Sequence, residues 1–198
     1  MKKKEEDQEI KIILVGEPFT GKTSLINTAI GLKFDEKEVS TSTANFVTKE
    51  FKIDGKSYIT NLWDTIGQEK FRSLTKIFIK DSRIVVFVFD ITNKKTFEEL
   101  TFWMNTIEEI LGTDVILGLA ANKQDLYDKE EVKEEEIKKF SEEKNIPFNY
   151  TTAKNPKLFV TFLEELLKKY IDKYDGKVEG SSGKKLEEGK EGKKRKCC

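Results

Sequence analysis

The sequence predicts an α/β fold in which a mostly parallel, six-stranded sheet carries helices on both faces. Short apolar runs of strand length alternate with longer segments of helical periodicity through most of the chain, a pattern typical of parallel strands joined by crossover helices. Two of the runs, Ile84–Asp90 and Val115–Ala121, are almost wholly apolar, as expected of strands that are covered on both faces. A glycine-bearing loop between the first run and the first helical segment supports the same fold.

The elements are expected in a regular order along the chain. The predicted strands are Ile10–Val15, Phe46–Ile53, Ser57–Trp63, Ile84–Asp90, Val115–Ala121 and Phe148–Thr151. The predicted helices run from Lys22 to about Ile30 and over Thr96–Leu111, Val132–Lys144 and Lys157–Tyr174. The dipeptide Asp54-Gly55 supplies the positive φ angles that a tight turn requires. The second and third strands are therefore expected to form a hairpin.

The composition indicates one domain followed by a segment of different character. The chain has 198 residues, of which 37% are apolar and 36% charged, and this supports one hydrophobic core. After Tyr174 the remaining residues include too few apolar side chains to offset the entropy of ordering. Residues 176–198 hold eight bases against four acids, which leaves the rest of the chain acidic. We expect an N-terminal extension over residues 1–8, a domain over 9–174 and a disordered basic tail over 175–198.

Missing residue types exclude several kinds of chemistry. Without histidine the chain cannot form a Ser-His-Asp triad, a Cys-His pair or a histidine-ligated metal site. Its two cysteines, Cys197 and Cys198, provide neither a disulfide framework nor a four-cysteine zinc site. The longest apolar run, Ile84–Phe89, is far shorter than the ~20 residues of a membrane-spanning helix. The first ten residues carry charge where a signal peptide is apolar, so we expect a chain that is neither secreted nor membrane-spanning.

The segment Gly16–Thr23 fits the phosphate-binding pattern G-x-x-x-x-G-K-[ST]. It follows a predicted strand and opens a predicted helix, which is the context that the pattern requires. In such a loop, backbone N–H groups and the helix N-terminus point at phosphate oxygens. Lys22 would neutralise the β- and γ-phosphate charges, and Thr23 can bind Mg²⁺. The alternative interpretation is an ordinary glycine-rich turn without a ligand.

Three further groups of polar residues follow predicted strands. Asp64 can hold Mg²⁺ through a water molecule, and the N–H of Gly67 can reach a γ-phosphate. Within Asn122–Asp125, the carboxylate of Asp125 can accept two hydrogen bonds from the N1–H and amino group of guanine, which adenine does not offer. The segment Thr151–Lys154 can present backbone N–H groups to the base. Because ligands bind at the carboxyl ends of strands in such folds, the motifs together predict a guanine-nucleotide site.

With the segments around them, these motifs resemble the Rab branch of the Ras superfamily of small GTPases. The resemblance covers about residues 8–174, and besides the motifs it is carried by Leu62–Thr65, Gly67–Leu74 and Val88–Thr92. Two more segments, Phe78–Ser82 and Gly112–Val115, lean toward the Golgi-associated Rab proteins. The resemblance implies a P-loop NTPase fold of the small G domain type.

The resemblance assigns roles to the matching positions. Positions with a nucleotide-binding role are Glu17, Pro18, Phe19, Thr20, Gly21, Lys22, Thr23, Ser24, Phe34, Thr41, Gly67, Asn122, Lys123, Asp125, Thr152, Ala153 and Lys154. The implied Mg²⁺ ligands are Thr23, Thr41 and Asp64. In catalysis Gln68 resembles the glutamine that orients the attacking water, while Lys22 and Thr41 act at the phosphates.

Three aromatic residues, Phe46, Trp63 and Phe78, match positions that Rab effectors read. The alternative interpretation is that they are plain core aromatics, and both can hold at once.

At the C-terminal end of the chain, Cys197 and Cys198 match the Rab-type double prenylation site, and the basic residues before them would attract anionic lipid. The alternatives there are two inert thiols, and a nuclear signal or solvated charge.

Several residues depart from the Rab pattern. Pro18 has no N–H, Phe19 is bulky where relatives have small residues, and Ile66 replaces an alanine near the γ-phosphate. Thr43 and Asn45 replace a glycine and an acid. Phe19 and Ile66 support an alternative function, a nucleotide-locked Rab-like interaction module with impaired hydrolysis, whereas the retained Gln68 speaks against it. A third candidate, a kinase that uses ATP, is disfavoured by the guanine-specific motif.

The resemblance predicts a switch that hydrolyses GTP to GDP and phosphate and regulates vesicle traffic. Its cofactors would be GTP or GDP and Mg²⁺. Its partners would be an exchange factor, a GTPase-activating protein, a Rab escort protein, a GDP-dissociation inhibitor and effectors, together with a membrane bound through two prenyl groups. We expect a monomer without a nucleic-acid role, in the cytosol and on the cytoplasmic face of intracellular membranes such as the Golgi.

Overall fold

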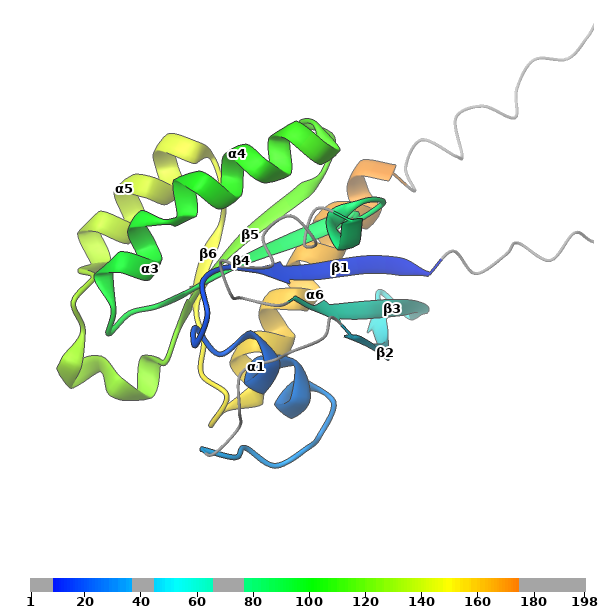
Figure 1. Ribbon diagram of the computed structural model, residues 1–198. Helices are drawn as coiled ribbons and strands as arrows, with labels where there is room; N and C mark the ends of the chain where they lie inside the picture. Colours follow the sequence, from blue (N-terminus) through cyan, green and yellow to red (C-terminus); the bar gives the residue numbers. More distant parts are fainter. Residues whose placement is uncertain (1–8, 37–44, 66–76, 175–198) are drawn as a thin grey trace, which may run out of the picture.

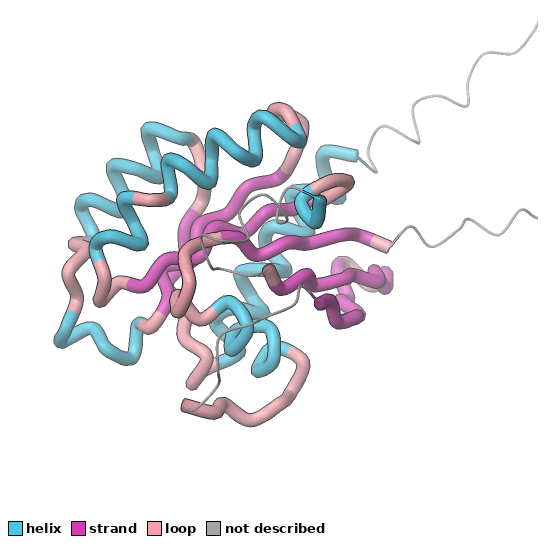
Figure 2. Tube along the Cα trace, in the orientation of Figure 1, coloured by secondary structure: helices cyan, strands magenta, loops and turns pink. Residues whose placement is uncertain are grey.

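The computed structural model describes residues 9–36, 45–65 and 77–174, which are drawn in colour in Figure 1. The strands are β1 (Ile10–Val15), β2 (Asn45–Ile53), β3 (Lys56–Asp64), β4 (Ile84–Asp90), β5 (Ile116–Asn122) and β6 (Phe148–Tyr150). The helices are α1 (Lys22–Ala29), α3 (Lys94–Glu98), α4 (Leu100–Leu111), α5 (Glu134–Lys144) and α6 (Pro156–Tyr174), with a 3₁₀ helix, η2, at Gln124–Lys129. Figure 2 shows how the helices surround the strands.

The six strands form one sheet in the order β2-β3-β1-β4-β5-β6. Only β2 and β3 pair antiparallel, and the other neighbouring strands are parallel. In the turn between β2 and β3, Asp54 has a φ of 49° and Gly55 a φ of 81°, as the predicted hairpin requires. The predicted α/β fold with a mostly parallel, six-stranded sheet is therefore confirmed.

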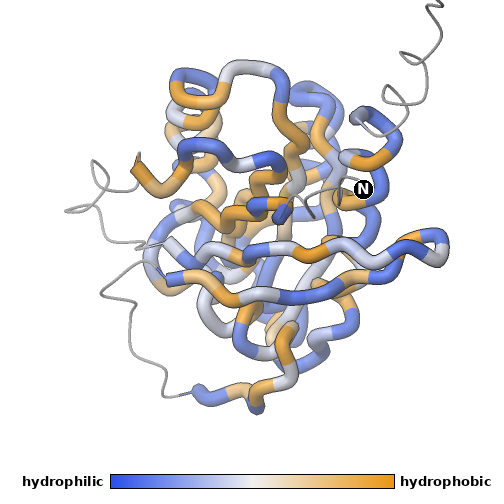
Figure 3. Tube along the Cα trace, turned by 90° about the vertical axis from the view of Figure 1, so that its right-hand side faces the viewer, coloured by the Kyte–Doolittle hydropathy of each residue, from blue (hydrophilic) through white to orange (hydrophobic). Residues whose placement is uncertain are grey.

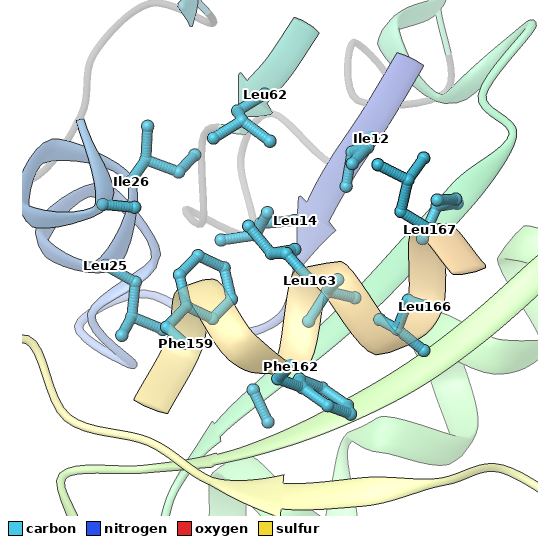
Figure 4. Packing of buried hydrophobic residues seen from close by; sticks show 14 of the residues in the cluster. Ile12, Leu14, Leu25, Ile26, Leu62, Phe159, Phe162, Leu163, Leu166 and Leu167 are labelled. Carbon is cyan, nitrogen blue, oxygen red and sulfur yellow. The ribbon is translucent and has the colours of Figure 1, made fainter. Parts of the chain in front are cut away.

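The sheet separates two hydrophobic cores, because successive side chains of a strand point to opposite faces. In β1, Ile12 and Leu14 pack with apolar residues of α1 and α6, a cluster seen in Figure 4. Their neighbours Ile13 and Val15 pack instead with residues of α4 and α5. Every residue of β4 is buried, so this strand is covered on both faces, as its apolar sequence predicts.

Strand β5 carries a glycine at the point where helix α6 comes closest. A Cβ at Gly118 would lie 2.5 Å from Leu166 Cδ1 and 3.0 Å from the ring of Phe162. Because Gly118 has no side chain, helix α6 can pack directly against strand β5. This contact fixes the strand whose carboxyl end, at Asn122, belongs to the site described below.

Some element boundaries differ from those that the sequence predicts. The single helix predicted over Thr96–Leu111 is two helices, because the backbone at Glu99 turns to a ψ of −8° between them. The first begins at Lys94, and the Thr96 hydroxyl of its first turn accepts a 3.0 Å hydrogen bond from the backbone N–H of Asp90. The 3₁₀ helix η2 was not among the predicted elements, and α5 begins at Glu134, two residues later than predicted.

Hydrophilic and hydrophobic residues follow one another closely along the described chain (Figure 3). Helix α6, which has 19 residues, buries Phe159, Phe162 and Leu163 while Glu164 and Lys168 remain outside the core. None of the helices within residues 9–36, 45–65 and 77–174 is long and apolar enough to cross a membrane.

Candidate functional site

The loop from Gly16 to Gly21, here called the phosphate loop, joins the carboxyl end of β1 to helix α1. Both glycines have positive φ angles, of 148° and 89°. A Cβ at Gly16 would lie 2.1 Å from the carbonyl oxygen of Val88 in β4, so the backbone approaches this neighbour more closely than any other residue would permit. A Cβ at Gly21 would lie 2.5 Å from Nδ2 of Asn122. The two glycines are thus required by close approach, and the loop opens helix α1 as the motif predicts.

Lys22 is buried at the start of α1, and its ammonium group lies under the phosphate loop. Nζ donates hydrogen bonds to the carbonyl oxygens of Gly16, at 3.0 Å, and of Glu17, at 2.8 Å. Burial lowers the pKa of Lys22 to about 8, although the nearby carboxylates of Asp64 and Glu17 act to raise it. A negatively charged phosphate group at the loop would stabilise the protonated ammonium of Lys22 and so raise its pKa. The site is therefore electrostatically prepared for an anion.

Two oxygen-bearing side chains that could bind a metal ion, Thr23 and Asp64, lie next to each other beside Lys22. The Thr23 hydroxyl, in the first turn of α1, donates a 2.6 Å hydrogen bond to Asp64 Oδ2 at the end of β3. Asp64 is only 7% exposed. Hydroxyl and carboxylate oxygens are the hard ligands that Mg²⁺ prefers. Within the described part of the chain, no group of three or more acidic residues, histidines or cysteines is placed so that it could hold a metal ion.

Asn122, the last residue of β5, joins two loops of the site. Its Nδ2 donates a 2.7 Å hydrogen bond to the carbonyl oxygen of Thr20, and its Oδ1 accepts one of 3.2 Å from the Thr151 hydroxyl. Both partners are buried. The predicted nucleotide-binding residue Asn122 therefore fixes the phosphate loop against the segment that follows β6.

Asp125 presents a carboxylate at the start of η2. Its Oδ1 accepts a 2.6 Å hydrogen bond from the Thr152 hydroxyl, and its Oδ2 lies 2.9 Å from Lys154 Nζ. Burial alone would raise the pKa of Asp125, but these two hydrogen bonds outweigh it, so the pKa lies below the usual value. The group is thus held ionised as a fixed pair of acceptors, which is the form that would bind the N1–H and amino group of guanine.

Other predicted residues surround this carboxylate. Lys154 Nζ lies 5.8 Å from the centre of the Phe34 ring and 3.6 Å from a carboxylate oxygen of Glu36. Lys123 has a φ of 65°, and its ammonium pairs with Asp90 Oδ2 at 2.6 Å. Sequence reasoning did not assign roles to Glu36 or Asp90. No local pattern indicates either pair, since each joins residues far apart in the chain.

Of the remaining predicted site residues, some lie in the part of the chain that the structure describes and the others lie outside it. Phe19 is 74% exposed on the phosphate loop with a φ of 63°, next to Pro18. Ser24 lies in α1, where its carbonyl oxygen accepts a hydrogen bond from Thr28, and Ala153 is buried after β6. The predictions outside the described residues concern Thr41, Thr43, Ile66, Gly67, Gln68, Cys197 and Cys198.

The three predicted effector aromatics form one cluster, in which Phe46 stacks on Trp63 and the ring of Phe78 is tilted against Trp63. The ring of Trp63 lies 4.8 Å from that of Phe46 and 6.0 Å from that of Phe78, between centroids. Lys11 Nζ lies 4.3 Å from the Trp63 ring centroid. Phe46 is 44% exposed and the other two rings are half-buried, so the cluster contributes both to packing and to the surface.

The site also includes a buried residue that sequence reasoning missed. Trp103 in α4 donates a 3.0 Å hydrogen bond from Nε1 to Glu17 Oε1 on the phosphate loop. The residues are 86 positions apart, so the pattern of α4 indicates only a core position. A buried indole N–H does require an acceptor, and this is the one signal that could have raised the question.

Comparison with known proteins gives a consistent result. A family model described as "Ras family" matches residues 11–172. The chain is similar to Ras-related protein Rab-21 of Bos taurus, Homo sapiens and Mus musculus, at 33% identity over 162 residues in each case. The matched segment covers 82% of this chain and 73%, 72% and 73% of those proteins.

Proposed function

Because this chain belongs to the Ras family as a Rab-type small GTPase, we propose that it is a timed switch that binds GTP and hydrolyses it to GDP and phosphate. One observation carries the proposal. Buried Lys22, the Thr23–Asp64 pair and the ionised carboxylate of Asp125 all follow the carboxyl ends of parallel strands. This is the edge where ligands bind in parallel α/β folds. Asn122 joins the phosphate loop to the segment after β6 through Thr20 and Thr151.

The phosphate end of the site supports charge neutralisation. The ammonium of Lys22 would bind the β- and γ-phosphates, and the N–H groups of the phosphate loop would bind their oxygens. Thr23 and Asp64, with Thr41 by resemblance, would hold Mg²⁺, which neutralises charge on the β- and γ-phosphates. The donor set of a hydroxyl and a carboxylate fits that ion.

In the reaction, a water oxygen attacks the γ-phosphorus while the bond from this phosphorus to the β–γ bridging oxygen breaks. The electron pair of that bond remains on GDP, and a proton of the water ends on the released phosphate. Gln68 is proposed, from the resemblance, to orient the water. Positioning and charge stabilisation supply most of the catalysis in this class of reaction.

The base end of the site favours guanine. The Asp125 carboxylate offers two acceptor oxygens, held in place by Thr152 and Lys154. Guanine presents two adjacent donors at its N1–H and amino group, whereas adenine presents an acceptor at N1. An adenine would therefore leave the carboxylate opposite an acceptor, which costs binding free energy. Phe34, placed near Lys154, would pack against the base.

Membrane traffic is the setting that the family implies, with exchange factors, GTPase-activating proteins, a GDP-dissociation inhibitor and effectors as the general classes of partner. We further propose that the cluster of Phe46, Trp63 and Phe78 contacts effectors, because the ring of Phe46 is exposed. Prenylation of Cys197 and Cys198 by way of a Rab escort protein, and residence on cytoplasmic membrane faces, are proposed from the sequence of the tail.

A specific observation supports the second candidate, a nucleotide-locked interaction module that barely hydrolyses GTP. Phe19 places a large exposed ring on the phosphate loop, in a backbone conformation that favours glycine. If this ring obstructs the reacting phosphate or the switch segments, nucleotide would bind without turnover. The variant Phe19→Gly would then raise the hydrolysis rate, and the timed switch predicts no such gain.

Single-turnover hydrolysis of GTP in the presence of Mg²⁺ tests the proposal. The native protein should convert bound GTP to GDP, and Gln68→Leu should react at least roughly tenfold more slowly while binding GDP with similar affinity. Tight binding without turnover in either protein, even with an activating protein added, would contradict the timed switch and favour the locked module. Failure to bind guanine nucleotides would contradict both.

A further inference from the structure

A buried tryptophan connects helix α4 to the phosphate loop. Trp103 is only 1% exposed, and its Nε1–H donates to Glu17 Oε1 at 3.0 Å. Glu17 is the second residue of the loop, directly after Gly16. A hydrogen bond between a buried donor and a carboxylate is stronger than one between neutral groups. The bond is therefore a strong link between helix α4 and the phosphate loop.

Glu17 is also held through its backbone by two residues of the site. Its carbonyl oxygen accepts hydrogen bonds from Lys22 Nζ, at 2.8 Å, and from the Thr20 hydroxyl, at 2.9 Å. One residue thus receives bonds from Trp103 at its side chain and from the site itself at its main chain. A change in the position of Glu17 would move the acceptor that fixes the Lys22 ammonium.

The phosphate loop is anchored at two points along its length. The Trp103 indole holds its start at Glu17, and the Asn122 amide holds the carbonyl oxygen of Thr20 at 2.7 Å near its end. Pro18 and Phe19 bridge the two anchors, and Phe19 adopts a φ of 63° there. A non-glycine residue in this conformation is strained and persists only where its surroundings fix it. Loss of one anchor would let the loop leave this geometry.

We propose that Trp103 is a positioning residue of the nucleotide site, which holds the phosphate loop through Glu17 and thereby sets the rate at which nucleotide is released. The proposal rests on the guanine-nucleotide binding proposed above. A ligand bound by only one conformation of a loop loses affinity in proportion to the population of the others. Most of this loss is expected in the dissociation rate, since association rates vary less among variants of one site.

The test is the release of a fluorescent GDP analogue, chased with excess GDP in the presence of Mg²⁺, from the full chain. Trp103→Phe keeps an aromatic ring in the core and removes the N–H, and it should release the analogue roughly tenfold faster, the factor that 1.4 kcal/mol of lost binding free energy gives. The control Ile107→Val truncates another buried residue of α4. It should lower the melting temperature without changing the release rate.

Variants on the loop side of the bond keep the test independent of the core. Glu17→Ala should also speed release, whereas Glu17→Gln retains an acceptor oxygen and should recover part of the slow release. The double variant Trp103→Phe/Glu17→Ala should be no faster than Glu17→Ala alone, because both changes remove the same bond.

Two results would overturn the inference in different ways. If the native protein releases GDP slowly and Trp103→Phe matches it, or matches Ile107→Val, the bond serves only to satisfy a buried N–H. If effects of Trp103→Phe and Glu17→Ala simply multiply in the double variant, the tryptophan does not act through Glu17. A native protein that binds no guanine nucleotide at all would instead refute the proposed function, and this inference with it.

Discussion

The Thr23 hydroxyl donates its proton to Asp64 Oδ2 at 2.6 Å, which joins helix α1 to strand β3 across 41 residues of sequence. A hydroxyl that donates its proton to a carboxylate can still act as an oxygen ligand to a metal ion. The carboxylate in turn can accept a hydrogen bond from a metal-bound water, as sequence reasoning suggests for Asp64. If Mg²⁺ binds as proposed, the pair would provide one direct ligand and the group that orients it.

The first prediction concerns this pair and Mg²⁺. In Thr23→Ala and Asp64→Ala, the Mg²⁺ concentration that half-maximally slows GDP release should rise on the order of 10- to 100-fold, because the ligand or its orienting acceptor is lost. Thr23→Ser keeps the hydroxyl and is the matched control. Titrations of Mg²⁺ against the release rate provide the measurement, and equal midpoints in all four proteins would contradict the assignment.

The second prediction is a pH dependence set by Lys22. The pKa of the buried ammonium is about 8 in the protein without nucleotide, and bound phosphates favour the protonated form. Above pH 8 the protein must take up a proton in order to bind, so affinity falls as pH rises. GDP affinity should decrease roughly fourfold between pH 7 and 8.5.

A variant of Glu17 checks the origin of this pH dependence. The Glu17 carboxylate raises the pKa of Lys22, so Glu17→Gln should move the midpoint to lower pH. Isothermal titration at a series of pH values measures both proteins. A GDP affinity that stays constant from pH 7 to 8.5 would show that Lys22 is not the titrating group.

The third prediction concerns the choice of base. Asp125→Asn replaces one acceptor oxygen by an amide donor, which faces the guanine amino group unfavourably but suits the 2-oxo group of xanthine. GDP affinity should fall on the order of 100-fold or more, and xanthosine diphosphate should bind better than it does to the native protein. Asp128→Asn changes another carboxylate of η2 and should leave both affinities unchanged. Competition against a fluorescent GDP analogue measures all three proteins.

Much of this architecture can be predicted from sequence because local chemistry specifies it. The Asp54-Gly55 dipeptide predicts a turn because such a turn requires positive φ angles. The pattern of Gly16–Thr23 predicts a phosphate loop because its glycines permit close backbone approach and its lysine supplies a cation. The interruption at Glu99 could not be predicted, because the apolar spacing of a helix continues across it and the turn of the backbone carries no pattern of its own.

The contacts that complete the site are the part that sequence cannot supply. Trp103 appears in the sequence as one more apolar position of an amphipathic helix, and only the packing of α4 on the sheet brings its N–H to Glu17. The ion pair of Lys123 with Asp90 likewise depends on the pairing of β4 with β5, which aligns Asp90 with Asn122. Such relationships depend on tertiary register and not on spacing along the chain.

The fourth prediction concerns Phe19. A left-handed conformation costs a non-glycine residue about 1–2 kcal/mol, and glycine gives back roughly 0.5–1 kcal/mol through its greater freedom in the unfolded chain. Phe19→Gly should therefore raise the free energy of unfolding by about 0.5–1 kcal/mol, since the exposed ring contributes little burial. Phe19→Ala keeps the strain and should give no gain. Urea denaturation distinguishes the variants, and a destabilised Phe19→Gly would indicate that the ring packs on a partner segment.

The two ends of strand β5 belong to opposite poles of the molecule. At its carboxyl end Asn122 holds the phosphate loop, and beyond its amino end Asp114 receives the last turn of α6, through the Tyr174 hydroxyl at 3.1 Å and Lys173 at 2.8 Å. In Figure 1 α6 likewise ends on the side where β1 begins, away from the phosphate loop. Seven strand residues separate the poles by roughly 23 Å. If residues 175–198 bind a lipid surface, the chain would leave the domain toward that surface at the end opposite the nucleotide site. Nucleotide could then be bound, hydrolysed and exchanged while the protein stays attached to the lipid.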